Sequence, residues 1–126
     1  MSNKNDLKFL IVDDSKISRK RLSNLLKEMG YEIIYEAVDG LDAISQFKKH
    51  NVDYILMDLE MPKMNGDIAS KEIINLNPDV HIILVTSIID KKELVGALRA
   101  GVEKILQKPI TLEKLQQAIK EIEDRA

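Results

Sequence analysis

Five residues that could take part in phosphoryl chemistry each follow a short apolar segment of the sequence. They are Asp13, Asp14, Asp58, Thr86 and Lys108. Taken alone, an aspartate after an apolar run is most simply a cap for the following loop. Gathered together, three carboxylates repel one another and need a cation, and one of them can attack phosphorus to form an aspartyl-phosphate. A lysine ammonium and a threonine hydroxyl can bind phosphate oxygens. The residue types therefore predict a metal-assisted phosphoryl-transfer site.

These residues can meet only if the segments that carry them lie side by side. Residues 54–57 form a continuous apolar run, too short for a helix and broken by the nearby Pro62, which favours a strand covered on both faces. Similar strands are predicted at 8–12, 32–36, 80–85 and 104–107. A helical pattern follows each strand, which predicts parallel pairing with right-handed crossovers. We expect an α/β fold with a doubly wound, five-stranded parallel sheet and helices on both faces, of the flavodoxin-like type. The carboxyl ends of its strands would meet at one edge.

Helix boundaries are marked by capping residues and glycines. Gly30 and Gly101 are expected to end the first and fourth helices, and Gly66 to begin the third. The apolar stripes direct Leu76 of the third helix and Leu98 of the fourth toward the sheet. The expected N-caps are Ser15, Asp39, Asp90 and Thr111.

Composition narrows the class of protein. The 126 residues suit one domain spanning 1–126, and 44% of them are hydrophobic, enough for one core. A net charge of -2 gives no reason to expect nucleic-acid or membrane binding. There is no cysteine, no apolar run long enough to span a membrane and no signal peptide. We expect a soluble cytoplasmic protein.

Four motifs together resemble the receiver domain of bacterial two-component response regulators, and single-domain chemotaxis-type regulators most of all. They are Asp13-Asp14, the segment 58–66 (Asp-Leu-Glu-Met-Pro-Lys-Met-Asn-Gly), residues 85–87 (Val-Thr-Ser) and Lys108-Pro109. The resemblance covers nearly the whole chain. It implies a phosphorylation-activated signalling switch that accepts a phosphoryl group on Asp58 from the phosphohistidine of a sensor histidine kinase or a phosphotransfer protein.

The resemblance also implies a set of metal ligands. Mg²⁺ or Mn²⁺ would be held by Asp14 and Asp58, with Asp13 acting largely through water and the Glu60 backbone carbonyl as a further ligand. Members of the family hydrolyse their own aspartyl-phosphate, so no enzyme activity is expected beyond the domain's own phosphotransfer and dephosphorylation. The Lys108–Pro109 peptide bond is expected to be cis.

The same resemblance implies how the signal leaves the domain. The expected output surface is the fourth helix, fifth strand and fifth helix, facing an unidentified output protein, in a monomer or a phosphorylation-dependent dimer. Ser87 is small and leaves the phosphate open to a donor. The family often has Tyr or Phe where this chain has Ile105, and an aliphatic side chain cannot make the inward ring movement of that aromatic residue.

Two other functions share parts of this constellation. A phosphatase of the haloacid-dehalogenase type would carry its nucleophile on the first strand with a second Asp two residues later, whereas Asp13 is followed by Asp14 and then Ser15. A flavodoxin-like cofactor module would need a glycine- and hydroxyl-rich first loop, whereas the first loop of this chain carries two carboxylates. A degenerate, phosphate-independent receiver is a further alternative, although all five site residues are present. The basic run 19–21 (Arg-Lys-Arg) on the first helix is a solvated face or a docking site for an acidic kinase surface.

Overall fold

Five strands and five helices alternate along the part of the chain that the structure, a computed structural model, describes: residues 6–59, 61, 63–87 and 90–125. The longest helix has 14 residues, and within these ranges no helix is long and apolar enough to cross a membrane. In chain order the elements are β1 (Lys8–Val12), α1 (Lys16–Glu28), β2 (Ile33–Ala37), α2 (Gly40–His50), β3 (Tyr54–Asp58), α3 (Gly66–Leu76), β4 (His81–Thr86), α4 (Lys91–Ala100), β5 (Lys104–Gln107) and α5 (Leu112–Arg125).

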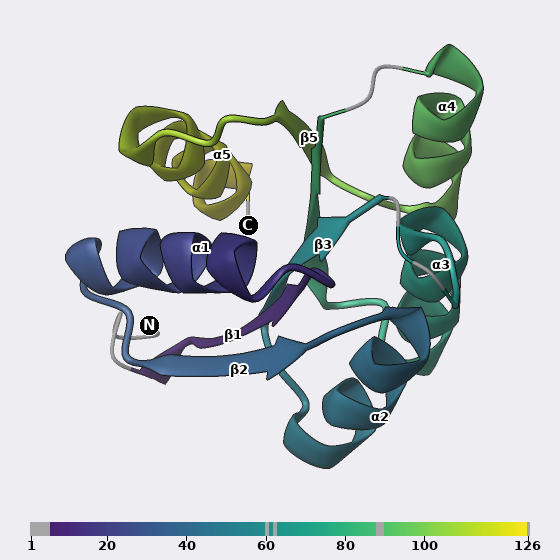
Figure 1. Ribbon diagram of the computed structural model, residues 1–126, viewed down its shortest axis with the longest axis horizontal. Coiled ribbons are helices and arrows are strands. Elements are labelled where there is room, and N and C mark those ends of the chain that lie inside the picture. Colours follow the sequence, from purple (N-terminus) through teal and green to yellow (C-terminus); the bar gives the residue numbers. More distant parts are fainter. Residues whose placement is uncertain (1–5, 60, 62, 88–89, 126) are drawn as a thin grey trace.

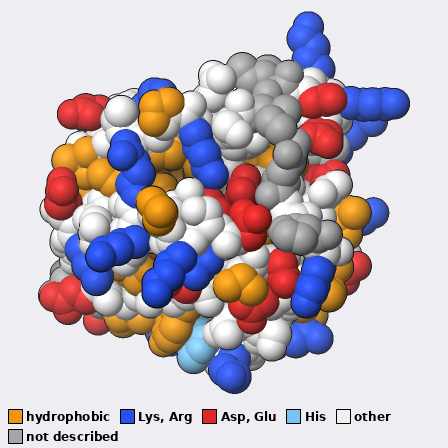
Figure 2. Space-filling view, in the orientation of Figure 1, with side chains coloured by type: hydrophobic (Ala, Val, Ile, Leu, Met, Phe, Trp, Pro, Cys, Tyr) orange, Lys and Arg blue, Asp and Glu red, His pale blue; other side chains and the backbone are white. Residues whose placement is uncertain are grey.

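The strands form one parallel sheet in the order β2-β1-β3-β4-β5, which confirms the predicted fold class (Figure 1). β2 and β4 each begin and end one residue later than the sequence predicted. Asp58 pairs in register with Val85, and Thr86 pairs with Gln107. The carboxyl ends of the strands are therefore level with one another. Acidic side chains gather near the end of β1 on the surface shown in Figure 2.

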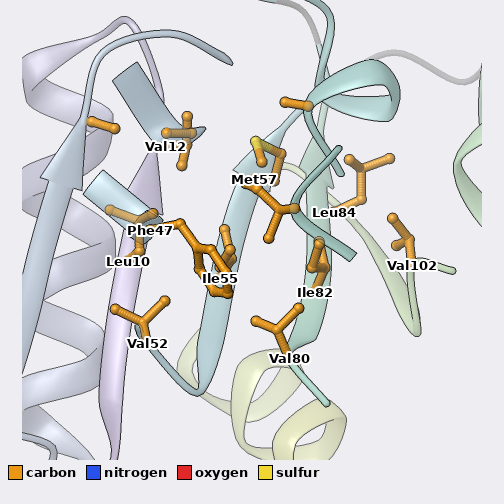
Figure 3. Packing of buried hydrophobic residues seen from close by; sticks show 14 of the residues in the cluster. Leu10, Val12, Phe47, Val52, Ile55, Met57, Val80, Ile82, Leu84 and Val102 are labelled. Atoms are coloured by element: carbon orange, nitrogen blue, oxygen red, sulfur yellow. The ribbon is translucent and has the colours of Figure 1, made fainter. Parts of the chain in front are cut away.

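Helices cover both faces of the sheet. α1 and α5 lie on one face, and α2, α3 and α4 lie on the other (Figure 1). β3 supplies both cores in alternation: Tyr54 and Leu56 face α1 and α5, whereas Ile55 and Met57 face the other layer. Figure 3 shows that second core, with Phe47 of α2 among the strand side chains. The central strand is buried on both sides, as its apolar run predicted.

Side-chain caps begin four of the helices at the predicted residues. Ser15 Oγ accepts from the Ser18 amide at 3.3 Å, and Asp39 Oδ1 accepts from the Asp42 amide at 2.8 Å. Asp90 caps α4 through two amides, and Thr111 Oγ1 accepts from the Lys114 amide at 3.2 Å. The caps fix the residue at which each helix begins after the loop that follows a strand.

Two residues that the sequence predicted to face the core are exposed, so these two predictions are wrong. Leu76 is 50% exposed and Leu98 is 53% exposed. Leu76 is the last residue of α3, one turn beyond Ile73, which is the last buried residue of that helix. α4 packs mainly against α3, and Ala97 is the one residue of this helix in the buried class among those described. A helix at the margin of a sheet buries a narrower stripe than its periodicity predicts.

A hydrogen bond ties α5 to the sheet at the edge opposite the acidic group. The Tyr54 hydroxyl donates to Glu123 Oε2. Burial and then this carboxylate raise the pKa of Tyr54 above its usual value, so the phenol remains a neutral donor. The bond anchors the last turns of α5 independently of the strand ends.

Candidate functional site

Three carboxylates meet at the carboxyl edge of the sheet. Asp13, Asp14 and Asp58 each offer a carboxylate oxygen, and these oxygens all lie within 4.8 Å of one another. Asp13 is buried, Asp58 is half-buried and Asp14 is exposed, so the group opens outward through Asp14. Like charges at this separation disfavour one another unless a cation joins them. An all-oxygen donor set of this kind fits a hard divalent cation such as Mg²⁺.

Lys108 supplies the positive charge of the group. Its Nζ lies 3.0 Å from Asp13 Oδ2 and 3.7 Å from Asp58 Oδ2. The backbone holds the residue in place, because the Lys108 amide donates to the Thr86 carbonyl at 2.8 Å. The Lys108–Pro109 peptide bond is cis, which is the isomer expected there. The amine therefore sits beside the carboxylate that the sequence marks as a nucleophile.

Asp13 is fixed in place by hydrogen bonds to its side chain and to its backbone. Its Oδ1 accepts from the Ser15 amide at 2.8 Å, while its Oδ2 accepts from Lys108. Its own amide donates to the Ala37 carbonyl at 3.1 Å. Both carboxylate oxygens of Asp13 therefore already accept protein hydrogen bonds.

The remaining predicted residues occupy different places. Thr86 is buried at the end of β4, and Ser87 follows it on the surface. Ile105 is the second residue of β5 and pairs with Leu84. Its side chain packs against the core under α2, α3 and α4, away from the acidic edge. Glu60, whose carbonyl was expected to bind the metal, and Pro62 of the motif lie outside the described residues.

Gly66 lets the chain return onto the end of β3. Its amide donates to the Leu59 carbonyl at 2.7 Å, and a Cβ placed on it would lie 2.3 Å from the Asp58 carbonyl oxygen. No side chain fits at that distance. In the sequence, Gly66 ends the receiver-like segment 58–66 and begins a helix, but neither observation predicts its close approach to the backbone of Asp58.

Replacing Gly66 with alanine (Gly66→Ala) is expected to lower the free energy of unfolding by about 1–3 kcal/mol, the usual cost of overpacking. The same push displaces Asp58, so the acidic group should also bind cations more weakly. The matched control is Gly96→Ala in α4, where the new Cβ would lie 3.4 Å from the mobile Asp67 carboxylate. Because alanine suits a helix better than glycine, the control should be neutral or stabilising in chemical denaturation. Equal stability of the two variants would contradict the assigned role of Gly66.

Arg19 is a second residue that sequence reasoning missed. It was expected on a solvated face or in a docking site, yet its side chain is only 13% exposed. Its Nη1 donates to the Asp13 carbonyl at 2.8 Å. The partner lies outside the helix, so no spacing within α1 could have signalled the contact.

Comparison with known proteins agrees with this geometry. A family model described as the response regulator receiver domain matches residues 9–120. The chain is 34% identical to the chemotaxis protein CheY of Halobacterium salinarum over 90% of its own length and 93% of the relative's. It is 32% identical to the CheY of Thermotoga maritima over 90% and 94% of the two chains.

A solved structure has the same fold. The CheY in the crystal structure of the CheX–CheY–BeF3–Mg complex from Borrelia burgdorferi superposes with a TM-score of 0.86 at 28% identity, covering 92% of this chain and 88% of that one. Receiver domains generally bind Mg²⁺ through an acidic cluster, and this chain has a cluster of that composition. The chain belongs to the response regulator receiver domain family, the CheY-like phosphorylation-activated switches of two-component signalling systems.

Proposed function

We propose that Asp58 is the phosphoacceptor of this switch, and that its donor is the phosphohistidine of a sensor histidine kinase or a phosphotransfer protein. The observation that carries this proposal is the meeting of three carboxylates and one amine at a single edge of the sheet. Oxygens of Asp13, Asp14 and Asp58 lie within 4.8 Å of one another, and Lys108 Nζ lies 3.7 Å from Asp58 Oδ2. This set combines a nucleophile, cation ligands and a phosphate-binding amine.

The transfer is a displacement at phosphorus. A carboxylate oxygen of Asp58 forms the new P–O bond while the P–N bond to the donor imidazole breaks, and the imidazole nitrogen keeps the electron pair. Asp58 is half-buried at the end of its strand, so a donor approaches from the open side. The Lys108 ammonium pairs with one phosphoryl oxygen and the Thr86 hydroxyl donates to another. Ser87 is small and leaves room for the donor.

We further propose that Mg²⁺ or Mn²⁺ is the cofactor. Asp14 and Asp58 would hold it directly, Asp13 through water, and the Glu60 carbonyl would add a ligand. When bound, the ion neutralises charge on the phosphoryl oxygens. Oxygen-only donors support a hard cation, and the Borrelia burgdorferi relative was crystallised with BeF3 and Mg²⁺.

The domain acts on itself and on no separate substrate. Water attacks the aspartyl-phosphate of Asp58 and releases phosphate, which resets the switch. We therefore propose a signalling protein with no enzyme activity beyond its own phosphotransfer and dephosphorylation. Residues 1–126 would form one receiver domain, since the described strands belong to one sheet. A cytoplasmic location goes with this role.

Output would pass through α4, β5 and α5. The residues that would hold the phosphoryl group, Thr86 and Lys108, stand at the ends of β4 and β5, so phosphorylation favours one arrangement of these ends over another. Ile105 packs in the same core cluster as Leu94 of α4 and can transmit a shift by packing, without the ring movement of an aromatic residue. The output partner is a protein that reads this surface, from a monomer or a phosphorylation-dependent dimer.

The test is transfer from acetyl phosphate, a small donor that needs no docking surface. Incubated with Mg²⁺ and acetyl phosphate, the whole chain is expected to gain one phosphoryl group in intact-protein mass spectrometry. The group should be lost again after the donor is removed, because the acyl phosphate hydrolyses. An unchanged mass under these conditions, in protein shown to be folded, would contradict the proposed function.

A further inference from the structure

Two arginines of the basic run on α1 donate hydrogen bonds to other parts of the fold. Arg19 Nη1 donates to the Asp13 carbonyl at 2.8 Å, and its Nε donates to Glu36 Oε1 at 2.9 Å. Arg21 Nη2 donates to the Ile110 carbonyl at 3.1 Å. Lys20, between them, is exposed, as is Arg21, but no side-chain hydrogen bond of Lys20 is found among the described residues. Basic side chains around α1 are visible beside the acidic group in Figure 2, yet these two guanidinium groups are engaged with the fold.

Arg19 braces the loop that carries the acidic pair. The Asp13 amide donates to the Ala37 carbonyl at 3.1 Å, and Arg19 holds the Asp13 carbonyl from the other side. Its second bond, to Glu36, joins the same loop to β2. A planar guanidinium can reach both acceptors at once, whereas an ammonium offers a single nitrogen. The backbone on either side of the Asp13 side chain is therefore fixed by groups that do not touch the proposed phosphoryl group.

Arg21 braces the segment that carries the amine. Ile110 lies two residues beyond Lys108 and is buried. Its carbonyl accepts from Arg21, and both residues line a hollow of about 400 Å³ between α1 and this segment. Lys108 and Asp13 are themselves 3.0 Å apart. α1 thus holds, through two arginines, both of the loops whose side chains form this ion pair.

We propose that Arg19 and Arg21 are positioning residues: Arg19 sets the cation-binding loop, and Arg21 sets the segment of Lys108. This inference rests on the proposed function for what the site does. For Arg19, this role predicts a change in Mg²⁺ affinity that is opposite in sign to the change expected from charge alone. Removing a positive charge near a cation site should strengthen cation binding by Coulomb's law, whereas removing a brace should weaken it.

Calorimetric titration of the purified whole chain with Mg²⁺ tests the role of Arg19. Arg19→Gln is expected to bind Mg²⁺ about tenfold more weakly, the low end of the effect of outer-shell partners. Arg19→Lys keeps the charge but cannot make both bonds, so its affinity should also fall. Lys20→Gln, at the exposed lysine between the two arginines, is the control. Its Mg²⁺ affinity should stay within about twofold of that of the original chain, the scale of an exposed charge. These residues have similar helix propensities, and thermal unfolding checks that each variant is folded.

The role of Arg21 is tested at saturating Mg²⁺. Arg21→Gln is expected to lower the maximal rate of labelling by acetyl phosphate about fivefold, the factor that one ordinary hydrogen bond is worth. The amide resonances of Lys108 and Ile110 should shift in this variant and stay in place in Lys20→Gln. Because acetyl phosphate has no docking surface, a slower rate cannot come from lost contact with a kinase.

Opposite results would overturn the inference. Arg19→Gln that binds Mg²⁺ as tightly as the original chain, or more tightly, would refute the brace on the acidic loop. Arg21→Gln with unchanged amide resonances would refute the brace on Lys108. If the labelling rate of the variants fell only with a protein phosphodonor, the basic run 19–21 would be assigned to docking instead. If the original chain takes up no label, the proposed function fails, while the Mg²⁺ titration and the amide resonances still decide the roles of the two arginines.

Discussion

Replacing Asp58 with asparagine (Asp58→Asn) is expected to abolish labelling by acetyl phosphate, with a loss of at least about a thousandfold, as for other nucleophiles removed from a catalytic set. Asparagine has the same shape, but its amide oxygen is a poor nucleophile and carries no charge. Asp58 is half-buried at the end of β3, so the substitution changes the chemistry more than the packing. The measurement is the fraction of protein that gains a phosphoryl group, by intact mass.

The control for this variant is Asp79→Asn, an exposed aspartate in the turn before β4, at the opposite edge of the sheet. It should be labelled as fast as the original chain. Thermal unfolding of metal-free Asp58→Asn should show no loss of stability, since one of three mutually repelling carboxylates has been neutralised. Full labelling of a folded Asp58→Asn would show that another group is the acceptor.

Removing divalent cations is the change with the second largest expected effect. In excess chelator, labelling should fall below detection, because the phosphoryl group would then meet three carboxylates that the single Lys108 ammonium only partly neutralises. Restoring Mg²⁺ should restore the rate. Labelling that persists in excess chelator would refute the role of the acidic group as a cation site.

The same ion should stabilise the fold. Mg²⁺ at ten times its dissociation constant is expected to add about 1.4 kcal/mol to the free energy of unfolding, by binding the folded state alone. Sodium chloride at matched ionic strength is the control, since it screens the carboxylates without being held between them. In Asp14→Asn, which lacks one proposed ligand, the increment from Mg²⁺ should shrink markedly. An equal increment in this variant would place the ion elsewhere.

The sequence predicted the sheet because burial on both faces leaves a plain pattern. The apolar runs of β1 and β3 are bounded by acids at their carboxyl ends, and parallel pairing then brings those acids to one edge. The helix caps at Ser15 and Asp39 were predictable for a related reason, since a cap is a local hydrogen bond between near neighbours in the chain.

The features that the sequence could not supply depend on distant partners. Leu98 has the spacing of a core residue, but α4 lies at the margin of the sheet and exposes it. Arg19 belongs to a charged run, and only tertiary structure brings it to the Asp13 carbonyl and Glu36. Gly66 is an ordinary helix start until the backbone of Asp58 is found against it.

The position of the phosphoryl group on the chain is the most direct measurement. Borohydride reduces an acyl phosphate to an alcohol, so a phosphorylated aspartate is converted to homoserine and can be located by peptide mass spectrometry. After treatment with Mg²⁺ and acetyl phosphate, homoserine should be found at residue 58. A reduced residue at Asp13, Asp14 or any other aspartate, with residue 58 unmodified, would contradict the assignment of Asp58 as the acceptor.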